Sequence, residues 1–295
     1  GSGSSREVAV VAHQGAGIQL VIAESFQRIF QENMVYSGLP FSADPEVLDR
    51  LLVGEDVDLD ALAKELPPFF RSVAESGGLL PYGQALLDGE ILPSYDLDPP
   101  PRAMNAVEKV IAARGFRGAG QSFGLPSVQP GDQVLCEAGF RGMHEYTTGM
   151  VVDLYKKEFG NMPIQRPELV ACFEDHFVLI DHETVPESVK SKRLAPARRL
   201  AEEMVEACEA MGLRLHGPDR SLPAGVCPRL VVEDYAEPGT VLCLTDSHSP
   251  TAGVLNTFAF GVGSTAMAFA LRTGMIPVTV PKVVRVLVSG PTGGL

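Results

Sequence analysis

The sequence predicts an α/β protein whose C-terminal part is built around a parallel sheet. Two continuous apolar runs, 169–173 and 177–180, are typical of parallel strands buried on both faces. A third run, 240–244, ends in Thr245-Asp246-Ser247-His248 and passes into a glycine-rich turn, as strands do at a ligand-binding sheet edge. With 295 residues, 45% of them hydrophobic, the chain is long enough to form two domains.

Composition restricts the class of partner. The formal net charge of −13 disfavours binding to nucleic acid or to an anionic membrane, because both need clustered lysine and arginine. It leaves room for small anionic substrates, which need only a local arginine. We expect a cytoplasmic protein, since the chain has no signal peptide and no apolar run of about 20 residues. Five scattered cysteines, without a Cys-x-x-Cys pair, indicate reduced thiols that lie mostly in the core.

The first 91 residues are predicted to form a small β/α domain. Residues 7–13 have a helical pattern, 20–23 read as a short buried strand, and 24–36 place apolar residues at helical spacing. Gly38-Leu39-Pro40 ends that second helix. The acidic stretch 44–65 is expected to form short helices with a solvated face.

A proline-rich linker, 92–103, is predicted to separate this domain from a second one at 104–295. Besides the three apolar runs, the second domain is expected to contain helices at 103–114 and 190–211, strands at 133–137, 213–215, 229–232 and 283–288, and a helix that starts within 259–264. The resulting hypothesis is a three-layer α/β/α domain with its ligand site at the carboxyl edge of the sheet.

Acid–histidine pairs follow two of the predicted strands. Asp181-His182 comes after 177–180, and Asp246 with His248 comes after 240–244. Two such pairs at one sheet edge favour an active site in which carboxylates orient imidazoles for proton transfer. The alternative is that either pair only caps a helix or satisfies a buried loop. His13 and His216 lack such a context and are expected at the surface.

Four stretches resemble the aconitase and isopropylmalate dehydratase family of hydro-lyases. They are Gly3-Ser4-Ser5-Arg6-Glu7 with the following helix and Gly38-Leu39-Pro40; Val128-Gln129-Pro130-Gly131-Asp132 with His144-Glu145-Tyr146-Thr147-Thr148-Gly149; Asp181-His182 with Val185-Pro186; and Thr245-Asp246-Ser247-His248-Ser249-Pro250-Thr251 through Gly263. The first is similar to the family's swivel domain, which is the small subunit of the split enzymes, and the others to its large subunit. The resemblance implies a partial swivel-type domain followed by an aconitase-type domain.

The resemblance also implies a chemistry. Family members remove and add water on hydroxylated di- or tricarboxylates, with a [4Fe-4S] cluster that binds the substrate as a Lewis acid. The serine that removes the α-proton corresponds to Ser4, and the carboxylate-binding residues to Ser5 and Arg6. The groups that handle the proton of the leaving hydroxyl correspond to Asp181, His182, Asp246 and His248. The remaining substrate-binding candidates are Ser247, His144 and Glu145.

The sequence departs from the family pattern. The family's cluster is held by three cysteines in motifs that none of the five cysteines matches, so we expect no metal ligand in this chain. Pro228 stands where a further catalytic histidine is expected, Val8 where a histidine is usual, Ala266 where an acid is frequent, and Glu145 where an aspartate is usual. We expect a portion of a divergent hydro-lyase whose cluster comes from other segments or a partner subunit. The alternative is a non-catalytic subunit or pseudo-enzyme that binds an anionic metabolite or a partner chain. RNA binding is disfavoured by the acidic net charge.

Overall fold

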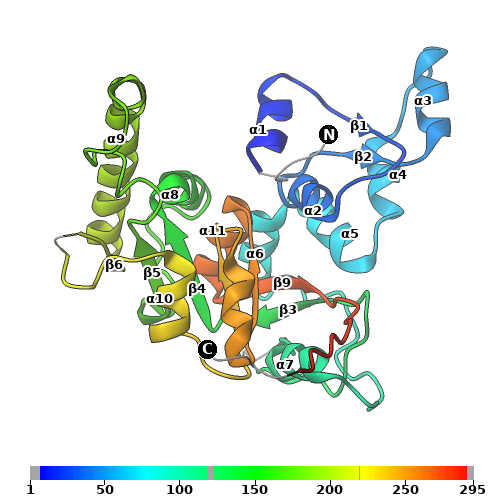
Figure 1. The fold of residues 1–295 in the computed structure, drawn as a ribbon. Coiled ribbons are helices and arrows are strands. Elements are labelled where there is room, and N and C mark those ends of the chain that lie inside the picture. Colours follow the sequence, from blue (N-terminus) through cyan, green and yellow to red (C-terminus); the bar gives the residue numbers. More distant parts are fainter. Residues whose placement is uncertain (1–6, 119–121, 219, 291–295) are drawn as a thin grey trace.

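The computed structural model describes residues 7–118, 122–218 and 220–290. Short helices dominate its N-terminal part, and a parallel sheet flanked by helices forms the C-terminal part (Figure 1). The N-terminal elements are α1 (Glu7–Gly15), β1 (Val21–Ile22), α2 (Arg28–Tyr36), β2 (Phe41–Ser42), α3 (Pro45–Leu52), α4 (Leu59–Lys64), α5 (Pro68–Glu75) and α6 (Leu79–Leu87).

The C-terminal elements begin after the proline-rich stretch. They are α7 (Ala106–Arg114), β3 (Gln133–Glu137), β4 (Phe140–His144), α8 (Glu145–Phe159), the 3₁₀ helix η1 (Pro167–Leu169), β5 (Val170–Phe173), α9 (Glu187–Met211), β6 (Arg214–His216), α10 (Cys227–Asp234), β7 (Val241–Leu244), the 3₁₀ helix η2 (Ser249–Leu255), β8 (Phe258–Gly261), α11 (Ser264–Thr273) and β9 (Met275–Thr279).

The parallel sheet has five strands in the order β6-β5-β4-β7-β8. Its side chains alternate between two cores. Phe140, Phe173 and Leu244 pack towards α10 and η2, whereas Cys172 and Cys243 belong to the core shared with α8, α9 and α11. Helices therefore cover both faces, as the continuous apolar runs predict. The three-layer α/β/α prediction is confirmed.

Two further strands form an antiparallel ribbon beside this sheet. β3 pairs with β9 from Gln133↔Thr279 to Glu137↔Met275. The helix α7 that precedes the ribbon starts with a capping box, in which Asn105 and Glu108 bind each other's backbone N–H groups. The predicted strand at 133–137 and the helix within 103–114 are both confirmed.

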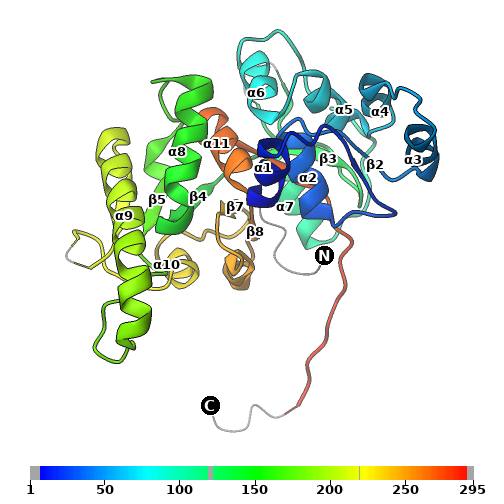
Figure 2. The same cartoon turned by 90° about the horizontal axis from the view of Figure 1, so that it is seen from above.

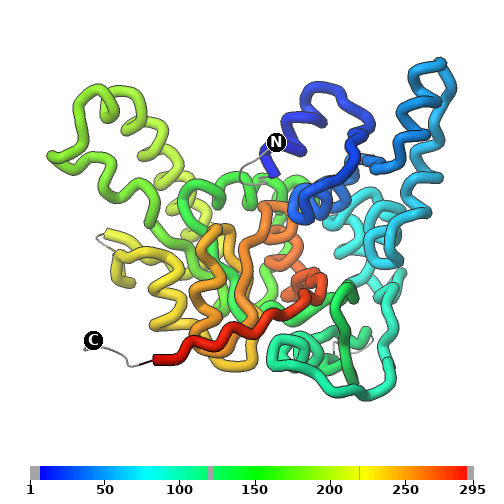
Figure 3. Tube along the Cα trace, turned by 45° about the vertical axis from the view of Figure 1, so that its right-hand side comes forward, coloured from blue at the N-terminus to red at the C-terminus, as the bar shows by residue number. Residues whose placement is uncertain are grey.

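Several predicted elements differ from those observed. Residues 229–232 belong to α10 and are not a strand, because Pro228 at the first turn presets the helical φ and places Leu230 and Val231 together on the buried face. The run 259–264 first completes strand β8, and α11 begins only at Ser264. Residues 283–288 are extended (Figures 2 and 3) but pair with no strand within the described residues. Their apolar side chains are exposed.

The N-terminal part contains both predicted helices, but α1 continues to Gly15, beyond its predicted end at 13, and α2 begins at Arg28 and not at 24. β1 and β2 pair in parallel, Val21 opposite Phe41, but the strand is half-exposed and not buried as expected. A small core next to this strand pair contains Val10 of α1, Met34 of α2 and Leu39. The acidic stretch forms the short helices α3 and α4, as predicted.

The main core continues across the proline-rich stretch. Phe69 of α5 and Tyr82 of α6 share one cluster with Phe269 of α11. The stretch itself packs on this body, where the Tyr95 hydroxyl donates to the Phe116 carbonyl at 2.8 Å. The boundaries 1–91, 92–103 and 104–295 stay a prediction.

Burial separates the structural histidine from the surface one. His13 is partly exposed and so lies at the surface as predicted, but the prediction for His216 is wrong, because His216 is 1% exposed and its ring stacks on Phe173. Its Nε2 lies 2.6 Å from the Tyr235 hydroxyl and its Nδ1 3.0 Å from the Pro223 carbonyl.

The described helices include none that is long and apolar enough to cross a membrane.

Candidate active site

The strand order fixes where a ligand can bind. The chain runs outward from β4 through β5 to β6, and then returns to the opposite side of β4 with β7 and β8. In such a sheet the connections at the carboxyl ends of the strands diverge at the point of reversal and leave a crevice. The residues that follow β4, β5 and β7 therefore form the candidate site.

The carboxylate after β7 is held in place by the backbone. Asp246 is 5% exposed, and its Oδ1 accepts the His248 N–H at 2.7 Å. The Ser249 hydroxyl donates to the Asp246 carbonyl. A Cβ atom at Gly261 would lie 2.8 Å from that same carbonyl oxygen, so the β8 backbone can approach this loop only with glycine. Asp246 is thus a buried and oriented acid, and its Oδ1 also lies 3.6 Å from His248 Nδ1.

The residue that ends β4 has an assigned ring orientation. His144 is the N-cap of α8, where the Tyr146 N–H donates to Nδ1 at 3.3 Å. Its Nε2 lies 3.1 Å from the Thr245 carbonyl. Since Nδ1 accepts, the hydrogen-bond pattern assigns the proton to Nε2. A neutral imidazole of this tautomer links the ends of β4 and β7.

The acid beside it supports the neighbouring loop. Glu145 is 1% exposed, and its carboxylate accepts the N–H of Asp175 at 3.1 and 3.2 Å and the N–H of Phe177 at 2.7 Å. These two amides are therefore not available to a β ladder, and the chain after β5 turns into a loop.

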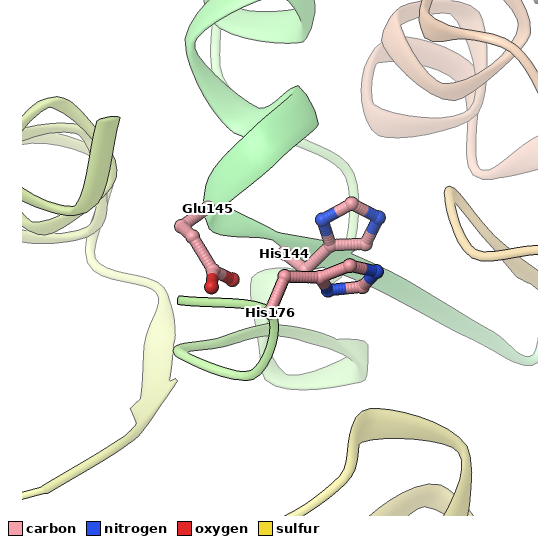
Figure 4. A group of neighbouring side chains, drawn as sticks. All are labelled: His144, Glu145 and His176. Carbon is pink, nitrogen blue, oxygen red and sulfur yellow. The ribbon is translucent and has the colours of Figure 1, made fainter. Parts of the chain in front are cut away.

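That loop brings a histidine to the site. The ring of His176 stacks on His144 with 4.0 Å between centroids and an interplanar angle of 25° (Figure 4). Its Nε2 lies 3.6 Å from Oδ2 of Asp246, and its Nδ1 lies 3.8 Å from Oδ2 of Asp175. Asp175 in turn accepts the Cys227 N–H at 2.9 Å. His176 is 40% exposed, so an imidazole accessible to solvent stands between two fixed carboxylates.

The prediction of a strand at 177–180 is wrong, because the amide that begins this run is held by the buried carboxylate described above. The pair that follows it does not stand at a strand end. Asp181 is exposed and accepts Arg198 Nη2 of α9 at 2.6 Å. His182 is exposed, with Nδ1 2.9 Å from the Thr184 hydroxyl. Their predicted catalytic role stays untested, and their contacts are those of a surface loop.

The other predicted site residues divide into two groups. His248 follows β7, but its side chain is 80% exposed, and its Nδ1 lies 3.3 Å from the Ser247 hydroxyl. Both face solvent at the sheet edge and are accessible to a ligand. Ser4, Ser5 and Arg6, predicted as base and carboxylate binders, lie outside the described residues.

Sequence reasoning missed His176 and Asp175, although the signal was present. They form an Asp-His pair that comes one residue after the apolar run 169–173. The sequence pattern favours the pair at 181–182, because a second apolar run precedes it. The structure assigns the strand end to the earlier pair.

The cysteines do not form a cluster site. All five lie among the described residues, all are buried and free, and they are distributed over β3, β5, α9, α10 and β7. Burial raises the pKa of the Cys243 thiol to about 12 and that of Cys136 further, whereas cluster iron requires thiolates. The residues present therefore do not fit a [4Fe-4S] cluster, and the expectation that the cysteines lie in the core is confirmed.

One group of possible metal ligands does converge. Ligand atoms of His144, Glu145 and His176 lie within 4.8 Å of one another (Figure 4). The carboxylate of Glu145 is already occupied by backbone N–H groups, and both ring nitrogens of His144 have hydrogen-bonding partners. This arrangement is suited to orienting an imidazole and not to holding an ion.

Comparison with known proteins gives the family. Residues 129–294 match the aconitase family (aconitate hydratase), and residues 1–44 match the aconitase C-terminal domain. The chain is 34% identical over 169 residues to the 3-isopropylmalate dehydratase large subunit 2 of Methanopyrus kandleri, an alignment that covers 55% of this chain and 37% of the relative. It is 29% identical over 197 residues to the chloroplastic large subunit of Arabidopsis thaliana, covering 63% of this chain and 35% of that protein.

The beginning of the chain matches a different set of relatives. It is 38% identical over 96 residues to the 3-isopropylmalate dehydratase small subunit of Moorella thermoacetica, covering 28% of this chain and 58% of the relative. The chain thus spans about a third of the large-subunit relatives' length and over half of the small subunit's. Because the family match extends over more than half of its residues, the chain belongs to the aconitase family, with the swivel-type part ahead of the aconitase-type part.

Proposed function

We propose that the chain is part of a hydro-lyase that removes or adds water on a small hydroxylated di- or tricarboxylate, with isomerisation through the unsaturated acid. The observation that supports this most strongly is the cluster of Asp175, His176 and Asp246 at the reversal point of the parallel sheet. An accessible imidazole that two oriented carboxylates flank is placed to exchange a proton with the hydroxyl of a bound substrate.

The chain's own residues divide the proton transfers. In dehydration, His176 gives a proton to the hydroxyl as the C–O bond breaks, so that water leaves, and Asp246 orients the His176 ring. The α-proton is taken by Ser4, a role that rests on the family resemblance. In hydration the two transfers reverse. Arg6 and Ser5 are proposed to bind a substrate carboxylate. Ser247 and His248 face solvent at the carboxyl edge of the sheet and are proposed to contact the substrate there.

Family members of this kind use a [4Fe-4S] cluster as a Lewis acid, and the cysteines of this chain do not fit one. We therefore propose that polypeptide other than this chain holds the cluster. Iron and acid-labile sulfide, measured together with intact mass on native protein purified without oxygen, test this. About four of each per assembly, with additional polypeptide mass, supports the proposal. Stoichiometric cluster on the isolated chain would contradict it.

Turnover is tested with 3-isopropylmalate, the compound named in the relatives, followed by other hydroxylated di- and tricarboxylates. Formation of the unsaturated acid is followed by its ultraviolet absorbance, on the native assembly. Activity that is lost in His176→Gln and kept in His182→Gln supports the assignment. The reverse pattern would return the role to His182.

A second candidate function is a non-catalytic subunit that binds an anionic metabolite or a partner chain. It is favoured by two observations: the five buried cysteines, and Pro228 in the buried first turn of α10 where the family pattern has a histidine. It predicts binding of a hydroxycarboxylate by calorimetry without turnover, and unchanged affinity in His248→Ala.

A further inference from the structure

A buried acid outside the proposed proton-transfer cluster joins the two parts of the chain. Glu7, the first residue of α1, is 5% exposed and lies against the start of α11, 258 residues away in sequence. Both carboxylate oxygens accept the Thr265 N–H, at 2.9 and 3.1 Å, and the Thr265 hydroxyl donates to Oε1. The carboxylate therefore occupies the N-terminus of α11, where free N–H groups and the helix dipole favour an anion.

The start of α11 is shaped to receive this side chain. A Cβ atom at Gly263 would lie 2.5 Å from Glu7 Oε2 and 3.0 Å from Asn33 Oδ1 of α2. Gly263 has φ −77°, so its absence of a side chain is required by the contact and not by the backbone conformation. The glycine is needed because Glu7 fills the space.

This contact lies at the same sheet edge as the proposed active site. α11 follows β8 directly, and the Val262 N–H donates to the Leu244 carbonyl at 2.9 Å, next to the loop that carries Asp246. Gly261 packs against the Asp246 carbonyl. A few residues of one connection therefore link the buried acid of the site to Glu7.

We infer that Glu7 is a positioning residue, whose carboxylate fastens α1 to the N-terminus of α11 and so fixes the entry of the chain at the active-site edge. In sequence Glu7 directly follows Arg6, the last residue of the proposed substrate-binding turn. Glu7 is therefore the described residue nearest in sequence to the proposed substrate-binding residues. The catalytic consequence rests on the proposed function, whereas the attachment of α1 does not.

Hydrogen exchange on the full chain tests the attachment. In Glu7→Ala, amides of residues 7–15 and of the first turn of α11 are expected to exchange faster by on the order of tenfold, because buried donors lose their acceptor. Amides of β5 and β7 should keep their rates. Glu7→Gln retains an acceptor oxygen and should stay near wild type, and Glu24→Gln, at an exposed acid, serves as control. Unchanged exchange of α1 in Glu7→Ala would overturn the inference.

A double-mutant cycle distinguishes loss of the direct Glu7 contact from a general loss of stability. Gly263→Ala should displace Glu7 and reproduce the faster exchange, but it should add little in the Glu7→Ala background, where the space is vacant. Additive effects would contradict a direct contact.

Turnover then tests positioning. In Glu7→Ala, kcat/KM of the native assembly should fall by about 10²-fold, as small misplacements do, with recovery in Glu7→Gln. If exchange changes as expected and the wild-type assembly shows no turnover, the proposed function fails and the attachment stands. If wild type turns over and Glu7→Ala matches it, the positioning role fails alone.

Discussion

Two aspartates that stand near histidines, Asp246 and Asp181, differ in how firmly their positions are fixed. Asp246 is buried, bonds to the backbone and faces His176. Asp181, also next to a histidine, is 53% exposed and pairs with Arg198 on α9. Both belong to acid–histidine patterns, but only Asp246 has a position fixed by a strand and by a backbone N–H donor. An acid orients an imidazole when its own position is fixed first.

The largest expected effect is on the histidines. His176→Gln should lower kcat/KM by about 10²–10⁴-fold, the usual contribution of general acid–base catalysis, while the unfolding midpoint changes little because the ring is 40% exposed. His182→Gln, in the exposed loop, should leave kcat/KM near wild type. Steady-state kinetics with a matched thermal scan distinguish the two. Equal losses would erase the proposed difference between the pairs.

A slightly smaller effect is expected for the acids. Asp246→Asn keeps an oxygen for the His248 N–H but removes the charge beside His176, so kcat should drop by on the order of 10²-fold. Asp181→Asn loses only an exposed ion pair, which contributes about 0–1 kcal/mol to the free energy of unfolding. If Asp246→Asn lowers only the melting temperature, the carboxylate is a loop-stabilising group and not part of the proton transfer.

Support of the loop after β5 is expected to show as stability. Glu145→Ala leaves the partly buried amides of Asp175 and Phe177 without their charged acceptor, which costs about 1–3 kcal/mol of unfolding free energy. Urea denaturation measures the loss, with the exposed Glu183→Ala as control, expected within about 0.5 kcal/mol of wild type. A negligible change in Glu145→Ala would mean that this loop is held by other contacts.

Much of the sheet could be predicted from local sequence patterns, but these patterns did not show which apolar runs fail to become strands. The runs 170–173 and 241–244 are apolar on both faces and became strands. The run 177–180 has the same composition but became a loop, because an acid 32 positions earlier takes up its first amide. Residues 283–288 have strong strand propensity and find no partner among the described residues. Propensity gives no information on whether a hydrogen-bonding partner is present.

The candidate site could also be predicted only in part. Asp246 was identified because the strand before it was predicted correctly, whereas His144 was identified only from the family resemblance, since the strand that it ends, β4, was not predicted. His176 was missed because its place depends on the Glu145 contact and on stacking with His144, both of which join residues about 30 apart. Glu7 was identified only as the start of a helix, although its partner Thr265 is 258 residues away. Contacts of this kind depend on tertiary packing, which no local spacing encodes.

The smallest expected effect concerns pH and extends the comparison to Glu7. Burial raises the pKa of Glu7 above its ordinary value of 4.5, and the hydrogen bonds from Thr265 and Ser264 only partly oppose this. The folded protein then holds the Glu7 proton to a higher pH than the unfolded chain does. Unfolding free energy should therefore fall as pH rises from about 4.5 through the folded-state pKa, by at most about 1.4 kcal/mol per pH unit from this group.

Glu7→Gln should remove that contribution. Urea denaturation of wild type and Glu7→Gln across this pH range gives the difference directly, with Glu32→Gln as a second case, since burial raises the pKa of Glu32 as well while Arg28 opposes the change. The variant should gain relative to wild type as pH rises, because it carries no charge to desolvate. A difference that is constant with pH would show that Glu7 has the same pKa in both states. Its hydrogen bonds to α11 would then fully offset its burial.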